Sequence, residues 1–222
     1  MYYLLGAVAF TVPAFSLGGV WLWLLWPALA LLMVALNYAV LNAGGFQKRA
    51  NGRLSAAARW LLAPYLAAAW LNSRLWTRKD PDPDQVLDNV WLGRIPTRQE
   101  LEDSAFTAVF DLCAELSLYP GSVAYRSLPV LDLTALDSAQ CEEAALAIES
   151  LRQQGPLLVC CALGYSRSAT AVAAWLLHSG RVASVDDAIQ LIQCARPGIV
   201  LGPLHRKTLQ QVATRMESSI VH

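Results

Sequence analysis

The chain has 222 residues, with 17 Lys or Arg against 17 Asp or Glu, so its formal net charge is zero. The balance hides an asymmetry: residues 1–80 contain seven basic residues and one acidic residue, whereas residues 81–222 contain ten basic and sixteen acidic residues. An acidic folded part is unsuited to a phosphate backbone, which excludes nucleic acid as the expected partner. The length accommodates one domain of about 140–150 residues and an N-terminal appendage.

The N-terminal appendage begins with two apolar segments, and no charged residue precedes Lys48. Residues 20–41 form an uncharged stretch that is long enough to cross a bilayer as a helix. Residues 2–17 are also apolar, but they are fewer and include Pro13. We therefore predict a transmembrane helical hairpin within residues 1–47. The alternative is that the first segment is only half inserted and packs on the second.

A basic stretch follows the hairpin at residues 48–79. Positive charge after the second span, with none in the hairpin turn, places the rest of the chain in the cytoplasm by the positive-inside rule. The same charge suits anionic lipid headgroups. Within this stretch the uncharged run between Arg59 and Arg74 is short for a span. We expect an interfacial helical segment of the cytoplasmic (inner) membrane; a third span is the alternative and would reverse the orientation.

A folded domain is expected from residue 86 to residue 217, after a stiff acidic linker at residues 80–85 that contains Asp-Pro-Asp-Pro-Asp. Strand patterns alternate with helix patterns in this region. The expected strands are 86–92, 108–113, 124–130 and 157–161, and the expected helices are 97–104, 138–153, 167–179, 184–195 and 202–217. This order predicts an α/β fold with a central, mostly parallel sheet flanked by helices and a site at the carboxyl ends of the strands.

The strongest chemical signal lies at residues 158–168. A buried strand ends at Cys161, a short loop follows, and a helix pattern begins at Arg167. Backbone N–H groups of such a loop and the helix N-terminus favour a bound phosphate, and the arginine can clasp two of its oxygens. A cysteine facing that positive site becomes a thiolate that can attack phosphorus. The loop residues expected to bind phosphate, mainly through backbone donors, are Ala162, Leu163, Gly164, Tyr165 and Ser166, together with Arg167.

The run from Cys161 to Ser168 resembles the signature loop of the cysteine-dependent protein phosphatases, and its Gly-Tyr-Ser-Arg-Ser ending resembles the dual-specificity branch. Residues 89–94 and 195–203 resemble other parts of the same domain, so the resemblance spans roughly the region 86–215. It implies a protein-tyrosine-phosphatase-like fold and a phosphocysteine intermediate, with neither a metal nor an organic cofactor. Ser168 is placed where its hydroxyl can donate to the cysteine sulfur.

The resembled family uses an upstream aspartate as the general acid, which later activates water. Asp132 lies just after an expected strand, and its spacing from Cys161 matches the family's position. Asp137 lies closer to Cys161 in the chain and is the alternative, although its position also suits the N-cap of the following helix. We expect Asp132 to be the acid.

Two further cysteines bear on the nucleophile. The family usually has histidine just before it, whereas this chain has Cys160, a smaller and weaker donor. We therefore expect a higher nucleophile pKa or a looser loop. Cys113 is a candidate redox partner for oxidised Cys161, with an ordinary buried thiol as the alternative, and Glu115 is placed to brace Arg167. The five cysteines lack metal-site spacing and suit a reducing compartment.

Together these patterns predict a membrane-anchored phosphatase that acts on phosphate monoesters. We place phosphotyrosine, phosphoserine or phosphothreonine proteins first as substrates. The loop interior has no basic residue besides Arg167, which disfavours polyphosphorylated inositol lipids. A lipid monophosphate with a phosphatidylglycerol-phosphate-like headgroup is the alternative, since it fits the hairpin and the basic segment. A non-catalytic phosphate-binding module is a further alternative, motivated by Cys160.

Overall fold

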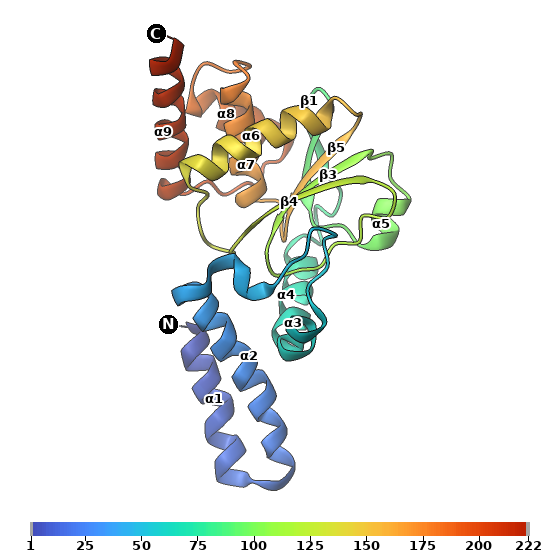
Figure 1. Cartoon of the computed structure of the whole chain (residues 1–222), viewed down its shortest axis with the longest axis vertical. Coiled ribbons are helices and arrows are strands. Elements are labelled where there is room, and N and C mark those ends of the chain that lie inside the picture. The colour runs from blue at the N-terminus through green and yellow to red at the C-terminus, as the bar shows by residue number, and fades with distance from the viewer. Residues whose placement is uncertain (1, 221–222) are drawn as a thin grey trace.

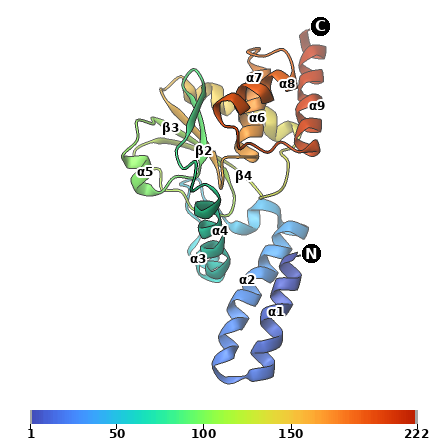
Figure 2. The same cartoon turned by 180° about the vertical axis from the view of Figure 1, so that it is seen from behind.

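The computed structural model describes residues 2–220, with side chains up to residue 215. Figure 1 shows a helical hairpin at the N-terminus that projects from a larger α/β body, and two further helices that lie beside the hairpin and below the sheet. Both the hairpin and the body contain buried apolar side chains. Figure 2 shows the same arrangement of these two helices from behind.

The hairpin consists of α1 (Tyr2–Leu17) and an antiparallel helical stretch over Gly19–Phe46. The second stretch contains η1 (Gly19–Leu24), α2 (Leu25–Leu36), η2 (Asn37–Leu41) and η3 (Asn42–Phe46). The two helices meet through small residues such as Ala14 and Ala30, which are fully buried. A side chain at Gly6 would collide with Leu31 of α2, since an added Cβ would lie 2.9 Å from its Cδ1.

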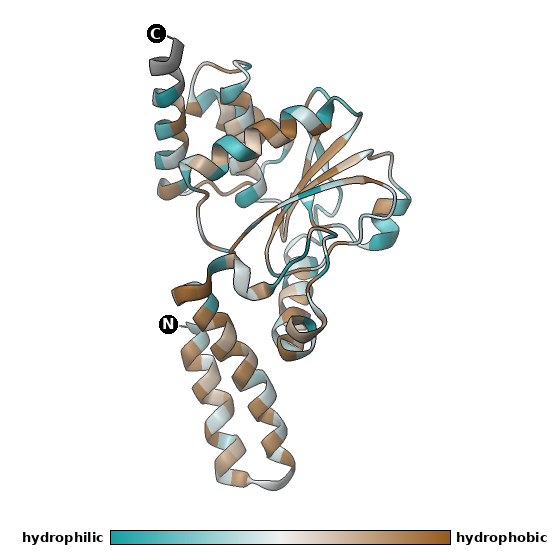
Figure 3. Ribbon diagram, in the orientation of Figure 1, coloured by the Kyte–Doolittle hydropathy of each residue, from teal (hydrophilic) through white to brown (hydrophobic). Residues whose placement is uncertain are grey.

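The hairpin is largely apolar, as the mostly brown and pale colouring in Figure 3 shows, and many of its apolar side chains are exposed. Phe15, Trp23 and Val40 each expose about two thirds or more of their surface. Among the described residues, the 28-residue stretch Gly19–Phe46 is the one helix long and apolar enough to cross a membrane, with a mean hydropathy of 2.1 over an 18-residue window. At 16 residues α1 is shorter. The hairpin therefore leaves much of its apolar surface exposed and does not bury it against the body.

The body is built on a five-stranded sheet with the order β1-β2-β5-β3-β4. Its strands are β1 (Asp84–Leu87), β2 (Val90–Arg94), β3 (Ala108–Cys113), β4 (Ala124–Val130) and β5 (Leu157–Cys161). All neighbouring pairs are parallel except β1 with β2. The expected mostly parallel sheet is thereby confirmed. The central strand β5 is buried at every residue, which its continuous apolar run explains.

One predicted strand is wrong in extent. Residues 86–92 do not form a single strand, because Asp88 adopts a left-handed backbone with φ of 49°. The chain turns there and continues antiparallel as β2, and Gln85 pairs with Trp91. Asp and Asn tolerate such a turn better than other side chains, and the sequence Asp88-Asn89 supplies both.

Helices cover both faces of the sheet (Figure 1). One face carries α6 (Ser138–Arg152), α7 (Arg167–His178), α8 (Val185–Ala195) and α9 (Pro203–Ile220), and its apolar core includes β5 residues Leu157, Val159 and Cys161. The other face carries α5 (Arg98–Glu102) and part of α4 (Ala63–Trp76), and its core includes Leu158 and Cys160. Because side chains alternate along a strand, adjacent cysteines of β5 face opposite cores.

Residues 48–79 pack onto the body. Lys48 pairs with Leu54 in a short bridge, and the N–H of Leu118 donates to the carbonyl of Gly52 at 2.9 Å. The helices α3 (Ala56–Leu61) and α4 follow, and Arg74 of α4 donates to the carbonyl of Ile95 at 2.9 Å. The bonds to Leu118 and Ile95 tie the basic segment to the body.

Candidate active site

Cys161 ends the central strand and opens the loop to α7. Its sulfur accepts hydrogen bonds from the Gly164 N–H at 3.3 Å and the Ser168 hydroxyl at 3.2 Å. Gly164 has a φ of +75°, and a Cβ there would lie 2.4 Å from the Gly93 carbonyl carbon. Glycine is therefore required where the loop turns and passes against β2. The backbone N–H groups of Gly164 and Ser168 therefore point toward the sulfur.

The thiol of Cys161 is buried, yet its pKa is lowered. Burial raises the pKa, but the positive charge of Arg167 and hydrogen bonds from Ser168 and Gly164 lower it below the ordinary thiol value. The surroundings of the neighbouring Cys160 act the other way, since burial followed by the charge of Asp111 raises its pKa well above that value. Of these two cysteines, only Cys161 has surroundings that favour a thiolate.

Arg167 begins α7 and is held rigidly. Its guanidinium donates to both carboxylate oxygens of Glu115, at 2.9 and 2.7 Å, and to the Val130 carbonyl at 2.7 Å. Its Nη2 also donates to Asp132 Oδ1 at 3.1 Å. Despite its burial, Glu115 has a lowered pKa because of Arg167, so it stays ionised. The bidentate pair fixes the plane of the guanidinium beside the loop.

Asp132 follows β4 and faces the loop through its contact with Arg167. Burial raises the pKa of its carboxyl; the charge of Arg167 lowers it, that of Glu115 raises it, and the net shift is upward. A raised pKa favours the protonated carboxyl that proton donation needs. Asp137 is occupied elsewhere: its carboxylate accepts the Gln140 N–H at 2.8 Å, and Gln140 returns the bond, which forms a capping box for α6.

Cys113 is buried at the end of β3, beside Glu115, whose pKa it helps to lower. Its side chain belongs to the apolar core on the face opposite Cys161. Both cysteines are free thiols, and the redox role expected for Cys113 stays a prediction. Within the described residues, His, Cys, Asp and Glu form no group of three that could hold a metal ion.

Two residues near the site come from the N-terminal part and were missed by sequence reasoning. The Tyr38 hydroxyl donates to the backbone carbonyl of Asp132 at 3.0 Å. The Ser73 hydroxyl donates to the Ala162 carbonyl in the loop at 2.5 Å. A polar side chain inside an apolar helix is the one sequence signal that marks Ser73, because such a group needs a buried partner.

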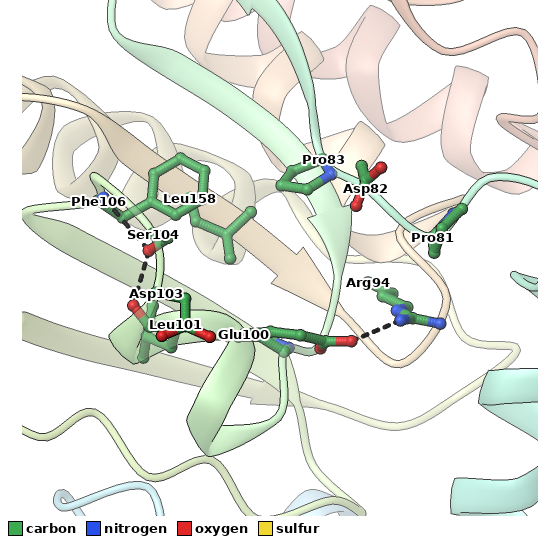
Figure 4. Close-up of a pocket in the computed structure, with 11 residues that line it drawn as sticks. Pro81, Asp82, Pro83, Arg94, Glu100, Leu101, Asp103, Ser104, Phe106 and Leu158 are labelled. Carbon is green, nitrogen blue, oxygen red and sulfur yellow. Dashed lines mark hydrogen bonds and ion pairs between the residues drawn. The ribbon is translucent and has the colours of Figure 1, made fainter.

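A separate cavity of about 360 Å³ lies along β2 and α5 (Figure 4). Two of its charged groups, Arg94 and Glu100, pair with each other at 2.7 Å. Cys161, Arg167 and Asp132 do not line it. The chemistry of the loop therefore does not extend into this cavity.

Comparison with protein families gives a match to the model described as "Dual specificity phosphatase, catalytic domain" over residues 90–215. Among curated proteins, the chain is similar to Dual specificity protein phosphatase 2 of Mus musculus, with 33% identity over 124 residues. The aligned region is 53% of this chain and 38% of the mouse protein, so the chain spans well under half the length of that relative.

Solved structures show the same fold. The structure of Tk-PTP in the active form has a TM-score of 0.56 and 29% identity, covering 61% of this chain and 99% of that one. Human DUSP28 has a TM-score of 0.55 and 25% identity, covering 61% and 99%. PTPMT1 in complex with PI(5)P has a TM-score of 0.55 and covers 61% and 97%, but at 19% identity its likeness shows the fold alone.

Proposed function

The chain belongs to the dual specificity phosphatase family, and on that premise we propose that it hydrolyses phosphate monoesters at a membrane through a phosphocysteine intermediate. The observation that carries the proposal is the setting of the Cys161 sulfur. It accepts two hydrogen bonds, from Gly164 and Ser168, at the start of a loop. Arg167, at the other end of this loop, is fixed by Glu115. A buried thiol with a lowered pKa and a phosphate-binding loop around it is suited to attack on phosphorus.

In the first step, Arg167 and the backbone donors of residues 162–166 bind the phosphoryl oxygens of the substrate. The Cys161 thiolate attacks phosphorus, and the bond from phosphorus to the ester oxygen breaks. Asp132 gives its proton to the leaving oxygen, so the alcohol departs uncharged. The products of this step are the free alcohol, a phosphocysteine and an ionised Asp132.

In the second step, the ionised Asp132 takes a proton from water, whose oxygen attacks the phosphocysteine. The sulfur–phosphorus bond breaks and inorganic phosphate leaves. The Ser168 hydroxyl, 3.2 Å from the sulfur, stabilises the thiolate as it departs. Asp132 is protonated again and Cys161 is again a thiolate, which closes the cycle.

The pKa shifts of the two residues support these roles. The reaction needs Cys161 ionised and Asp132 protonated at the same time. The pKa of Cys161 is lowered and that of Asp132 is raised, so the two shifts bring the pKa values toward each other. They therefore enlarge the fraction of molecules in the reactive protonation state.

We further propose that the hairpin of residues 1–47 anchors the enzyme in the cytoplasmic membrane, with residues 48–79 near the anionic surface. The phosphatase domain, 86–217, would then lie in the cytoplasm beyond the acidic segment at 80–85, whose last two residues belong to β1. The candidate span Gly19–Phe46 and the exposed apolar faces of the hairpin support anchoring. Phosphoproteins and lipid monophosphates both carry the ester that this chemistry breaks.

The test is phosphate release from a small aryl phosphate by the full chain in detergent micelles, compared with its Cys161→Ser variant. Turnover in the parent and none in the variant is the expected result. Equal rates would mean that Cys161 is not the nucleophile. Phosphate-ester binding without turnover in the parent would support the non-catalytic module instead.

A further inference from the structure

A cavity of about 300 Å³ adjoins the phosphate loop. At one end it is lined by the acid candidate Asp132, by Glu115, and by the loop residues Ala162 and Leu163. Glu115 and Asp132 both bond to Arg167, so this end lies beside the position that the ester group of a bound substrate would take. A cavity of this volume is within the range of small-molecule sites.

The other end of the cavity is formed by the helices that precede the domain. Tyr3 of α1, Leu31 of α2, and Tyr65 and Ala68 of α4 line it. Leu31 lies inside the candidate span Gly19–Phe46. The cavity therefore connects the phosphate loop with the part of the molecule that is built to contact a bilayer.

Hydrogen bonds and ring contacts hold this wall in place. Ser73 of α4 bonds to the loop at Ala162, and Tyr38 bonds to the backbone of Asp132. On the far side, Trp26 of α2 stacks on Trp60 of α3 with ring centroids 5.6 Å apart, and its indole N–H donates to the Trp60 carbonyl at 3.2 Å. The hairpin, α3 and α4 thus form one fixed wall against the site.

The lining changes in character along the cavity. The end at the loop is lined by the carboxylates of Glu115 and Asp132, both of which bond to Arg167. Asn72 and Ser73 lie beside it on α4, and the other end is lined by Leu31, Ala68 and the rings of Tyr3 and Tyr65. Because Arg167 behind these carboxylates supplies the positive charge, the change along the cavity suits a molecule with an anionic phosphate at one end and a hydrocarbon chain at the other. Apolar groups gain free energy when they leave water for such a lining.

On the basis of the proposed function, we propose that the substrate is a membrane lipid with a single terminal phosphate monoester. Its phosphate enters the loop at Cys161, its polar backbone passes Asn72 and Ser73, and its acyl part follows the apolar end of the cavity past Leu31 toward the bilayer. The lipid reaches the site laterally from the membrane, and the product alcohol returns there.

A leucine beside the acid supports this assignment. Leu133 directly follows Asp132, is 87% exposed and has a left-handed backbone with φ of 57°. That conformation is unfavourable for leucine. An apolar side chain held out in this way, next to a segment that Tyr38 of the hairpin region fixes, is suited to contact lipid. It offers no charge to an acidic or basic peptide.

The charge of the loop limits the headgroup. Residues 162–166 contain no Lys or Arg, and Arg167 is already engaged by Glu115. One phosphate is therefore all that the loop can neutralise, which disfavours headgroups with several phosphates.

The first experiment compares four substrates with the full chain in vesicles of phosphatidylcholine and phosphatidylglycerol. They are phosphatidic acid in the same vesicle, soluble glycerol 3-phosphate, a phosphotyrosyl peptide and an aryl phosphate. We expect kcat/KM for phosphatidic acid to exceed the values for the peptide and for glycerol 3-phosphate by at least about tenfold. A higher value for the peptide would overturn the proposal, and equal values for the lipid and glycerol 3-phosphate would mean that the acyl part is not recognised.

The second experiment uses matched substitutions in one alanine run. Ala68 lines the cavity, whereas its exposed neighbour Ala67 does not. Ala68→Trp narrows the apolar end and should lower the ratio of lipid to aryl phosphate kcat/KM by about tenfold. Ala67→Trp should leave that ratio unchanged. Leu31→Trp and Leu32→Trp on α2 form a second pair of the same kind.

The outcomes separate the two proposals. If the unsubstituted chain does not hydrolyse the aryl phosphate, the proposed phosphatase function is contradicted. Aryl phosphate turnover with an unchanged ratio in Ala68→Trp and Leu31→Trp contradicts the lipid assignment alone. An equal fall of the ratio in all four variants also contradicts it, because the effect would then not depend on the cavity.

Discussion

The Ser73 hydroxyl donates a hydrogen bond to the carbonyl of Ala162 at 2.5 Å, so a helix that follows the N-terminal hairpin supports the first residue of the phosphate loop. Both residues are buried. A buried carbonyl without a donor costs free energy, because water does not replace the lost bond. The loop geometry around Cys161 therefore depends on a segment that lies outside the matched catalytic domain.

The first prediction concerns this hydrogen bond. Ser73→Ala should lower kcat/KM for an aryl phosphate about three- to tenfold, because the Ala162 carbonyl loses its donor and the loop becomes less well fixed. The rates are measured with the full chain in detergent micelles. Thr214→Ala is the matched control: this exposed hydroxyl donates to the Gln210 carbonyl of its own helix at 3.0 Å. An unchanged rate in Ser73→Ala would show that α4 does not support the loop.

The second prediction concerns pH. The rising limb of kcat/KM against pH should follow ionisation of Cys161, and its falling limb should follow deprotonation of Asp132, whose pKa is raised. Asp132→Asn removes the proton donor and should lower kcat/KM by about 100-fold or more for a substrate with a poor leaving group. It should also abolish the falling limb.

Asp137→Asn serves as the control for that change, because Asp137 caps α6. It should cost some stability and leave the pH profile in place. If the falling limb disappears in Asp137→Asn and persists in Asp132→Asn, the assignment of the acid is wrong.

The sequence predicts the local part of this site well, because its residues lie on one continuous strand, loop and helix. Cys161, Gly164 and Arg167 are close together in the chain, and the backbone between them is dictated by a buried strand and a helix start. The assignment of Asp132 as the acid depended on the resemblance to the phosphatase family. Ser73 and Tyr38 could not be placed, since their contacts join residues that are 89 and 94 positions apart in the chain. Hydrophobic periodicity predicts local helices and strands, and it does not predict contacts between residues so far apart.

Lys48 illustrates a second limit of sequence reasoning. In the sequence it begins a basic run that suits lipid headgroups, whereas in the structure it is buried and bonds to Asp111 at 2.6 Å. A carboxylate in a fully buried strand requires a cation, so the position of Asp111 indicated that some basic side chain would be buried beside it. The sequence did not say which of the neighbouring basic residues would supply the charge.

The third prediction uses Glu115 as a positioning residue. Glu115→Gln weakens the bidentate hold on Arg167 and should lower kcat/KM about tenfold. It should also move the falling limb of the pH profile to lower pH, because the negative charge of Glu115 helps to raise the pKa of Asp132. A purely structural role would lower the rate without moving the limb. Glu102→Gln, which removes an exposed partner of Arg98, is the control.

The fourth prediction concerns the stability contributed by Lys48. Its ammonium group bonds to Asp111 and to the carbonyls of Cys113 and Leu116. Lys48→Met leaves the buried carboxylate unpaired and should lower the free energy of unfolding by about 3–5 kcal/mol. The exposed Lys79→Met should change it by less than about 0.5 kcal/mol. Both are measured by denaturant unfolding of the full chain in detergent micelles, and equal effects would contradict the buried pair.

The fifth prediction concerns a fragment that begins at residue 80. It contains the whole matched domain, but it lacks Lys48 and Ser73, so Asp111 loses its cation and Ala162 loses its donor. We expect this fragment to be unstable in solution, and Asp111→Asn within it to restore much of the folding, because the neutral amide no longer needs a buried cation. The Tyr125 hydroxyl, 2.9 Å from Asp111, can still bond to that amide.

The rescued fragment separates stability from catalysis. If it folds, as measured by cooperative unfolding, it should still turn over aryl phosphate more slowly than the full chain. Asp111→Asn removes the buried charge that needed Lys48, but it does not restore the hydrogen bond from Ser73 to the loop. A fragment that folds without the substitution and matches the full chain in rate would show that the segment before residue 80 serves only to attach the domain.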